Sequence, residues 1–118
     1  MGLPRSLAAL LALVLLDAAA KAAGGAFLAE MEDLPLAPGL TENSGGLLFD
    51  SPSGRIVDAA ASGDITPEQL RSFYAQTLPQ LGWEAVGDLA FRRDKEVLQI
   101  VLDADKQPLT AHFHLAPR

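Results

Sequence analysis

The sequence predicts an α+β fold in which one helix packs across an antiparallel sheet. Apolar residues recur at every third or fourth position over residues 66–81, and at every second position from residue 83 onward. Glycine, proline and aspartate clusters interrupt the alternating part, as they do in turns between strands. We therefore expect two layers, with the elements in the chain order β-β-α-β-β-β-β.

The helix has the clearest local signals. Thr66 suits the N-cap, Pro67 suits the first helical position, and Gln69 completes a capping box. Gly82 suits the position just after the helix ends. Aromatic residues at helical spacing usually belong to a core, so we assign the apolar stripe to the core rather than to a ligand site. The stripe comprises Leu70, Phe73, Tyr74, Thr77, Leu78 and Leu81.

Six strands are expected around this helix. A Ser-Pro-Ser-Gly turn joins the first two into a hairpin, and the last four form a meander after the helix. The expected strands are residues 47–49, 56–61, 83–86, 89–93, 96–102 and 109–116. Because side chains alternate along a strand, one set of apolar residues is expected on the sheet face that meets the helix. These strand residues are Leu89, Phe91, Leu98, Ile100, Leu102, Leu109, Ala111, Phe113 and Leu115.

The N-terminal residues predict a cleaved signal peptide over residues 1–22. Arg5 precedes the uninterrupted apolar residues 7–16, and Ala20-Lys21-Ala22 fits the cleavage pattern. A membrane-spanning helix needs about 20 apolar residues, whereas Asp17 ends this apolar run after ten. The alternatives are a buried N-terminal helix and an uncleaved anchor. The prediction places the protein in the periplasm or outside the cell.

The rest of the chain is expected to form one domain. Residues 23–45 mix glycine, proline and acidic residues, which predicts an irregular arm with one helical turn at residues 27–31. Residues 46–118 then form a single α+β domain, because cleavage after Ala22 leaves only 96 of the 118 residues.

The mature chain is acidic. The signal takes away 2 of the 9 basic and 1 of the 15 acidic residues, which leaves a formal charge of −7. Such a surface repels phosphate backbones and anionic lipid headgroups, so we expect no nucleic-acid partner and no stable membrane insertion after cleavage. The chain has no cysteine, which excludes disulfides and thiolate chemistry.

Both histidines, His112 and His114, lie in the last expected strand. With Phe113 facing the helix, they point to the opposite face, about 6.5–7 Å apart along the strand. In the pairing of strand 96–102 with strand 109–116, residues that face the helix must lie opposite each other, which leaves two registers. Either Gln99 faces His112 and Val97 faces His114, or Val101 faces His112 and Gln99 faces His114. Neither register supplies the third ligand that zinc requires, so we expect a solvated sheet face, with metal binding as the alternative.

A second candidate surface follows from the same alternation. A tight turn at Gly87-Asp88 turns Trp83 outward, opposite Arg92, where the indole and guanidinium stack. Trp83, Arg92, His112 and His114 then form a candidate binding face for a protein or small ligand. Three arrangements remain open for this face: cover by residues 27–60, which we favour, cover by a second subunit, or an exposed ligand site.

The sequence shows no catalytic pattern. The serines lack a nucleophile-elbow motif, and the glycine pairs carry neither a following helix nor a lysine to hold phosphate. Asp103 and Asp105 fit a solvated turn better than an acid/base pair. We therefore expect neither an enzyme nor a cofactor.

The stretch "FYAQTLPQLGW", followed by "LAFRR", "EVLQIVL" and "TAHFHLAPR", resembles small exported bacterial proteins of unknown function. So does the upstream "MEDLPLAPGLTENSGGLLFDSPSGRIVDAAASG". The resemblance implies a helix followed by a β-meander, and it implies no activity. Together these observations predict a non-catalytic envelope domain with a binding or accessory role. The alternative is a periplasmic metal-binding protein using His112 and His114.

Overall fold

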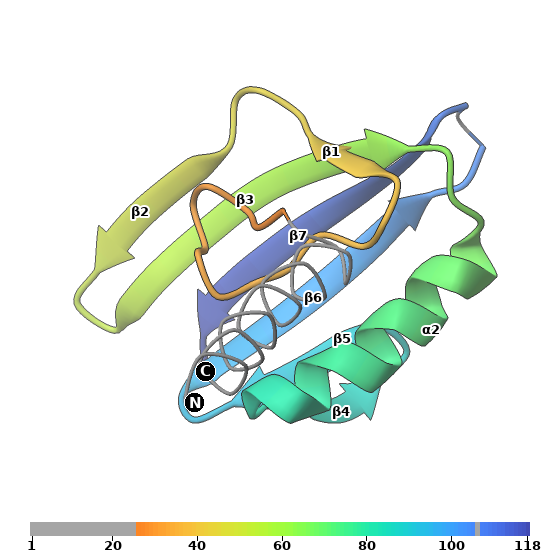
Figure 1. The fold of residues 1–118 in the computed structure, drawn as a ribbon. Coiled ribbons are helices and arrows are strands. Elements are labelled where there is room, and N and C mark those ends of the chain that lie inside the picture. Colours follow the sequence, from red (N-terminus) through yellow and green to blue (C-terminus); the bar gives the residue numbers. More distant parts are fainter. Residues whose placement is uncertain (1–25, 106) are drawn as a thin grey trace, which may run out of the picture.

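A computed structural model of the chain describes residues 26–105 and 107–118, so the predicted signal peptide lies outside the described residues. One helix packs against an antiparallel sheet, as the sequence predicts, and the sheet has seven strands where six are expected (Figure 1). The strands are ordered β1-β3-β7-β6-β5-β4, and β2 pairs with the same strand β3 as β1. The elements are β1 (Leu40–Glu42), β2 (Leu47–Ser51), β3 (Gly54–Gly63), α2 (Pro67–Thr77), η1 (Leu78–Leu81), β4 (Glu84–Gly87), β5 (Ala90–Arg93), β6 (Glu96–Asp103) and β7 (Leu109–Pro117).

Helix α2 begins as predicted. The Thr66 side chain accepts a hydrogen bond from the Gln69 backbone N–H at 3.1 Å, and the Gln69 side chain accepts one from the Thr66 N–H at 3.0 Å. Pro79 has no N–H to donate, and the helix tightens there into the 3₁₀ turn η1. Gly82 ends that turn with φ of 91°, a conformation that favours glycine.

The first hairpin is also confirmed, but the predicted chain order lacks one strand. β2 and β3 pair through Leu47↔Asp58 to Ser51↔Gly54. The additional strand, β1, pairs with the far end of β3. Its three residues are too few for an alternating pattern, and they lie within the glycine- and proline-rich arm.

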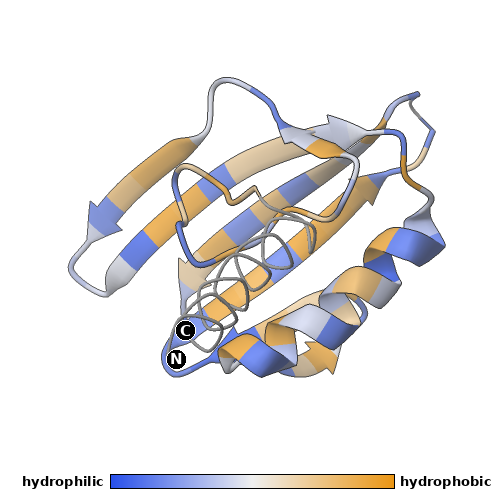
Figure 2. Ribbon diagram, in the orientation of Figure 1, coloured by the Kyte–Doolittle hydropathy of each residue, from blue (hydrophilic) through white to orange (hydrophobic). Residues whose placement is uncertain are grey.

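The inner face of the sheet, defined as the face against α2, carries the core. Apolar and polar residues alternate along the strands (Figure 2), and all the residues assigned to this face are buried except Leu102, which is partly buried. The Tyr74 ring lies between two aromatic neighbours, with centroid distances of 5.0 Å to Phe73 and 5.9 Å to Phe113. The predicted phase of the meander, from β5 to β7, is therefore confirmed.

The described part of the N-terminal arm, from residue 26, packs against the core beside the helix. Instead of the expected helical turn at residues 27–31, it forms two tight turns, closed by the bonds Met31 N–H to Leu28 O and Leu34 N–H to Met31 O. The turns direct Leu28, Met31 and Leu34 inward, where all three are buried. An isolated bridge between Phe27 and Pro35 holds the two ends of this loop together.

The hydroxyl of Tyr74 fixes the arm to the helix. It donates a hydrogen bond to the Pro35 carbonyl at 2.9 Å and accepts one from the Ala37 N–H at 3.2 Å. Burial raises the pKa of this hydroxyl far above its usual value, so it stays protonated and able to donate.

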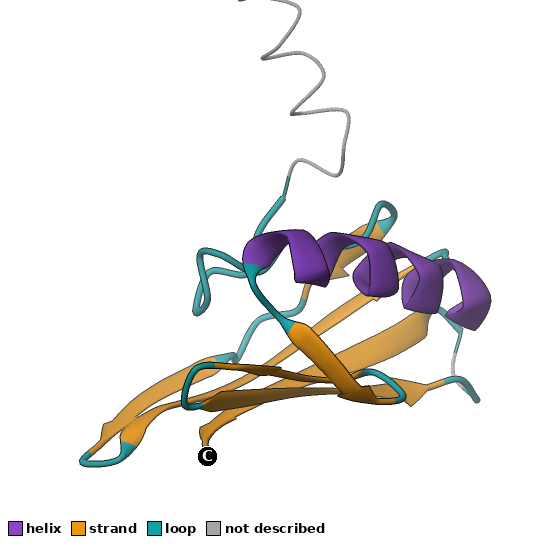
Figure 3. Cartoon of the chain, turned by 90° about the horizontal axis from the view of Figure 1, so that it is seen from below, coloured by secondary structure: helices purple, strands orange, loops and turns teal. Residues whose placement is uncertain are grey.

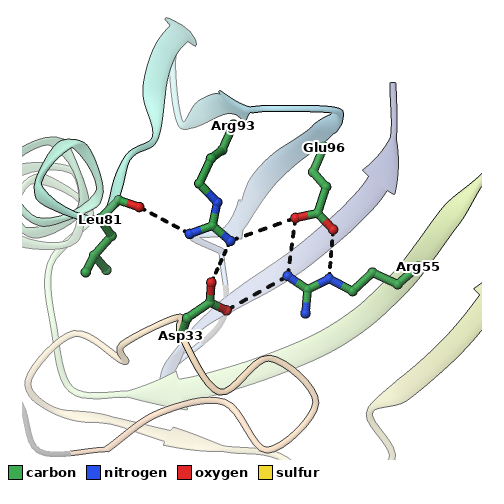
Figure 4. A network of polar contacts seen from close by, with 5 residues as sticks. All are labelled: Asp33, Arg55, Leu81, Arg93 and Glu96. Atoms are coloured by element: carbon green, nitrogen blue, oxygen red, sulfur yellow. Dashed lines mark hydrogen bonds and ion pairs between the residues drawn. The ribbon is translucent and has the colours of Figure 1, made fainter.

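An ion-pair network fixes the arm to the sheet (Figure 4). The Asp33 carboxylate of the arm accepts a hydrogen bond from Arg93, which also donates one to the Leu81 carbonyl. The Glu96 carboxylate accepts two hydrogen bonds from Arg55, at 2.7 and 3.2 Å. Partial burial alone would raise the pKa of Asp33, but the hydrogen bond and charge of Arg93, with the charge of Arg55, hold it below its usual value.

Candidate functional site

The outer face of the sheet, opposite α2, is open in the described part of the chain. Figure 3 shows the helix and the arm loops on the same side of the sheet. Val101, on the outer face, is 51% exposed. The expected cover by residues 27–60 is therefore wrong. The arm's apolar residues enter the core on the inner side, and the hairpin extends the sheet because β3 pairs with β7.

His112 and His114 lie exposed on the outer face, as predicted. The register is the second of the two expected: Val101 pairs with His112 and Gln99 with His114. On the other side of β7, Asp58 pairs with His114. The alternative register with Val97 opposite His114 does not occur.

Asp58 contacts His114 directly. Its Oδ1 lies 2.6 Å from Nδ1 of the imidazole, and both side chains are about half exposed. A carboxylate at this distance favours the tautomer with the proton on Nδ1, so Nε2 is left as the acceptor. This carboxylate orients the ring on the sheet surface, and it is the one polar residue of the site that the sequence reasoning missed.

A shallow hollow borders the histidines. It has a volume of about 230 Å³ and lies among the loop at residues 44–46, β3 and the two imidazoles. The loop supplies glycines at its wall, so the hollow has few functional groups beyond Asp58, His112 and His114. Small-ligand pockets are typically about 300–1,000 Å³ and enclose most of their ligand, which this open hollow does not.

A metal centre is not assembled here. Among residues 26–105 and 107–118, no group of three histidine or acidic side chains is placed to hold one ion. Arg92 lies on the outer face, where it pairs with Val97 of β6. Its guanidinium makes an ion pair with Glu84 at 3.2 Å.

Trp83 is not part of this site, which corrects the prediction. It is only 2% exposed and belongs to the core on the inner face. The reason is an irregularity in the ladder between Ala85 and Gly87, which shifts the alternation by one residue. The predicted cation–π contact is made instead by Arg93, whose guanidinium carbon lies 4.3 Å from the ring centroid.

Apolar residues surround the polar pair on the outer face. Leu47 and Phe49 of β2 pair with Asp58 and Ile56, which places both on the outer face. Val101 lies on the other side of the histidines, across β7. The outer surface therefore consists of a central Asp58–His114 pair between two exposed apolar areas.

A larger groove of about 750 Å³ lies elsewhere, between α2 and residues 38–39 of the arm. Ile65 and Phe73 form its apolar floor, and Asp64 and Glu68 line it with negative charge. None of the predicted site residues lies in it.

Comparison of the chain with protein-family models, with curated proteins and with solved structures finds no match. In the part of the chain that the structure describes, no helix has the length and apolar character needed to cross a membrane. The function proposed below rests on the geometry of the outer face.

Proposed function

We propose that the protein is a non-catalytic exported domain that binds a protein partner through the outer face of its sheet. The observation that supports this most is the exposure of Leu47, Phe49 and Val101 around a polar centre. Antiparallel sheets often leave one face to solvent, but that face is then lined by polar residues. Large exposed apolar residues on such a face are typical of an interaction surface.

The shape of the face favours a protein over a small ligand. The hollow beside the histidines is small and open, so a ligand there would keep much of its surface in water. A protein surface laid across the strands would contact Val101, Phe49 and the imidazoles at once. The exposed Phe49 and the oriented His114 combine an aromatic anchor with a polar contact, as protein interfaces do.

Export is the second part of the proposal, and it rests on the order of charge, apolar run and small residues at the N-terminus. The partner is then a component of the cell envelope or its surroundings. The formal charge of −7 on the mature chain favours a partner surface that is neutral or basic.

The second candidate is a periplasmic metal-binding protein that uses His112 and His114. One observation favours it: metal-binding histidines commonly hold a carboxylate at the other ring nitrogen, as His114 holds Asp58. The site would still need a further ligand from outside the described residues, or from a second molecule.

Site-specific photo-cross-linking in cells tests the proposal. Gln99, which lies opposite His114 on the outer face, is replaced by a photoreactive phenylalanine derivative. Gln76, an exposed glutamine on α2, is the matched control. We expect a discrete cross-linked protein from position 99 and none from position 76. Equal labelling from both positions, or none from position 99, contradicts the proposal.

Metal titration distinguishes the metal-binding protein from the partner-binding domain. Copper(II) or zinc is added to the purified protein and to the double variant His112→Ala, His114→Ala. Stoichiometric binding that the double variant loses would support a metal-binding protein and replace the proposal above.

A further inference from the structure

Strand β2 exposes three consecutive large apolar side chains. Leu47, Leu48 and Phe49 are 65%, 53% and 64% exposed. β2 pairs with β3 on one side, and no other described residue pairs with its second side. Natural edge strands normally carry lysine, proline or a bulge that discourages further pairing. The segment Leu47–Phe49 has none of these.

The three side chains point to both faces of the sheet. Leu47 and Phe49 lie on the outer face, whereas Leu48 pairs with the buried Val57 and so lies on the inner side. A partner packed flat on the outer face would cover Leu47 and Phe49 and leave Leu48 in water. Only a strand added along the free edge contacts all three, because its side chains also alternate between the faces.

We propose that a second copy of this chain supplies that strand, through antiparallel pairing of β2 with β2 about a two-fold axis at Leu48. In this register the two Leu48 residues face each other, and each Leu47 faces the Phe49 of the other copy. Asp50 faces Gly46, so the charge of one strand meets no like charge in the other.

The neighbouring registers are less favourable. A two-fold axis at Phe49 sets each Leu48 against Asp50 of the other copy, and an axis at Leu47 sets Leu48 and Phe49 against Gly46 and Gly45. The Leu48-centred register alone matches apolar with apolar residues on both faces. This self-complementarity, required of a two-fold interface, favours a second copy over an unrelated strand.

The dimer goes beyond the proposed function. It shares Leu47 and Phe49 with the proposed partner surface, but it depends on Leu48 and the free edge of β2, which that surface does not use. A two-fold axis at the edge runs perpendicular to the sheet, so both outer faces continue on one side of a single sheet. His112 and His114 of each copy remain exposed. The paired edge is short, since β2 has five residues, and we expect a reversible, concentration-dependent dimer.

Engineered cysteines test the register, because the chain contains none of its own. Residues directly opposite in an antiparallel pair have Cβ atoms about 4.5–5.5 Å apart, near enough for a disulfide after small adjustment. We expect Leu48→Cys to form a disulfide-linked dimer under mild oxidation. Val86→Cys, similarly exposed on the opposite edge strand β4, is the control and should stay monomeric.

Sedimentation of the cysteine-free protein measures the dimer itself. We expect the mass of two chains at high concentration and of one chain for Leu48→Lys, with an unchanged denaturation midpoint for this exposed position. A protein that stays monomeric at all concentrations overturns the dimer. So does disulfide dimerisation of Val101→Cys in place of Leu48→Cys, which would indicate packing between outer faces. Either result leaves the cross-linking test of the proposed function standing.

Discussion

The two faces of the sheet are built from the same strands, yet one is buried and the other is exposed. On β7, Phe113 is buried under Tyr74, while its neighbours His112 and His114 lie exposed on the opposite side. On the inner face, the helix and the arm cover the apolar residues, and the buried Tyr74 hydroxyl is paired with the backbone of the arm. On the outer face, apolar residues remain uncovered in the described part of the chain. The inner face therefore accounts for stability, and for the outer face we propose recognition of a partner.

Removal of the Phe113 ring should have the largest effect on stability. Phe113→Ala leaves a cavity beside Tyr74 in the centre of the inner face, and such changes cost about 3–5 kcal/mol. The free energy of unfolding is measured by urea denaturation. Val101→Ala, on the outer face, is the control and should cost less than about 1 kcal/mol. Similar losses at both positions would remove the distinction between the faces.

Tyr74→Phe should have an intermediate effect. The ring remains, but the Pro35 carbonyl and the Ala37 N–H lose their partner in a buried setting, at a cost of about 1–3 kcal/mol. Hydrogen exchange should also quicken in the arm more than in the meander. Unchanged stability would mean that water replaces the hydroxyl, and that the arm is not fixed by this contact.

Asp33→Asn should change how stability depends on pH, with an effect at neutral pH below about 1 kcal/mol because the carboxylate is 43% exposed. The pKa of Asp33 is lowered in the folded state, so the unfolded chain takes up the proton first. The stabilisation is therefore complete above the unfolded pKa of about 4 and is lost as pH falls through the folded pKa. Urea midpoints at pH 6 and pH 3 should differ less in Asp33→Asn than in the wild type. An equal or larger difference would contradict the role of the ion pair with Arg93.

The double variant His112→Ala, His114→Ala should have the smallest effect. Both side chains are exposed, and their one ion pair is at the surface, so the free energy of unfolding should change by less than about 0.5–1 kcal/mol. Thermal denaturation is sufficient to detect a larger change. A loss comparable to that of Phe113→Ala would make the histidines structural and move the candidate site elsewhere.

Much of the fold follows from local signals in the sequence. Thr66, Pro67 and Gln69 specify the start of the helix by contacts within four residues of each other. The alternation around Phe113 specifies which side of β7 is buried. Both the helix start and this alternation could be predicted, because neither depends on which strand lies beside the segment.

The candidate site depends on contacts that local patterns do not encode. Asp58 reaches His114 across 56 residues, through a pairing of β3 with β7 that alternation permits but does not require. Val57 and Ala59 are buried on either side of Asp58, and this alternation is present in the sequence, although no facing was predicted for these residues. Trp83 was misplaced because the irregularity before Gly87 shifts the phase of β4, and nothing in that short segment marks it.

Thiol accessibility in cells tests the central claim most directly, since the wild-type chain has no cysteine to interfere. Single cysteines are introduced at Val101 on the outer face and at Gln76 on the helix, and each is treated with a thiol reagent in cells and after purification. The account predicts that both cysteines react in the purified protein, and that only the one at position 101 is protected in cells. Full reactivity at position 101 in cells, or an unreactive cysteine there in the purified protein, would contradict an open face that a partner covers.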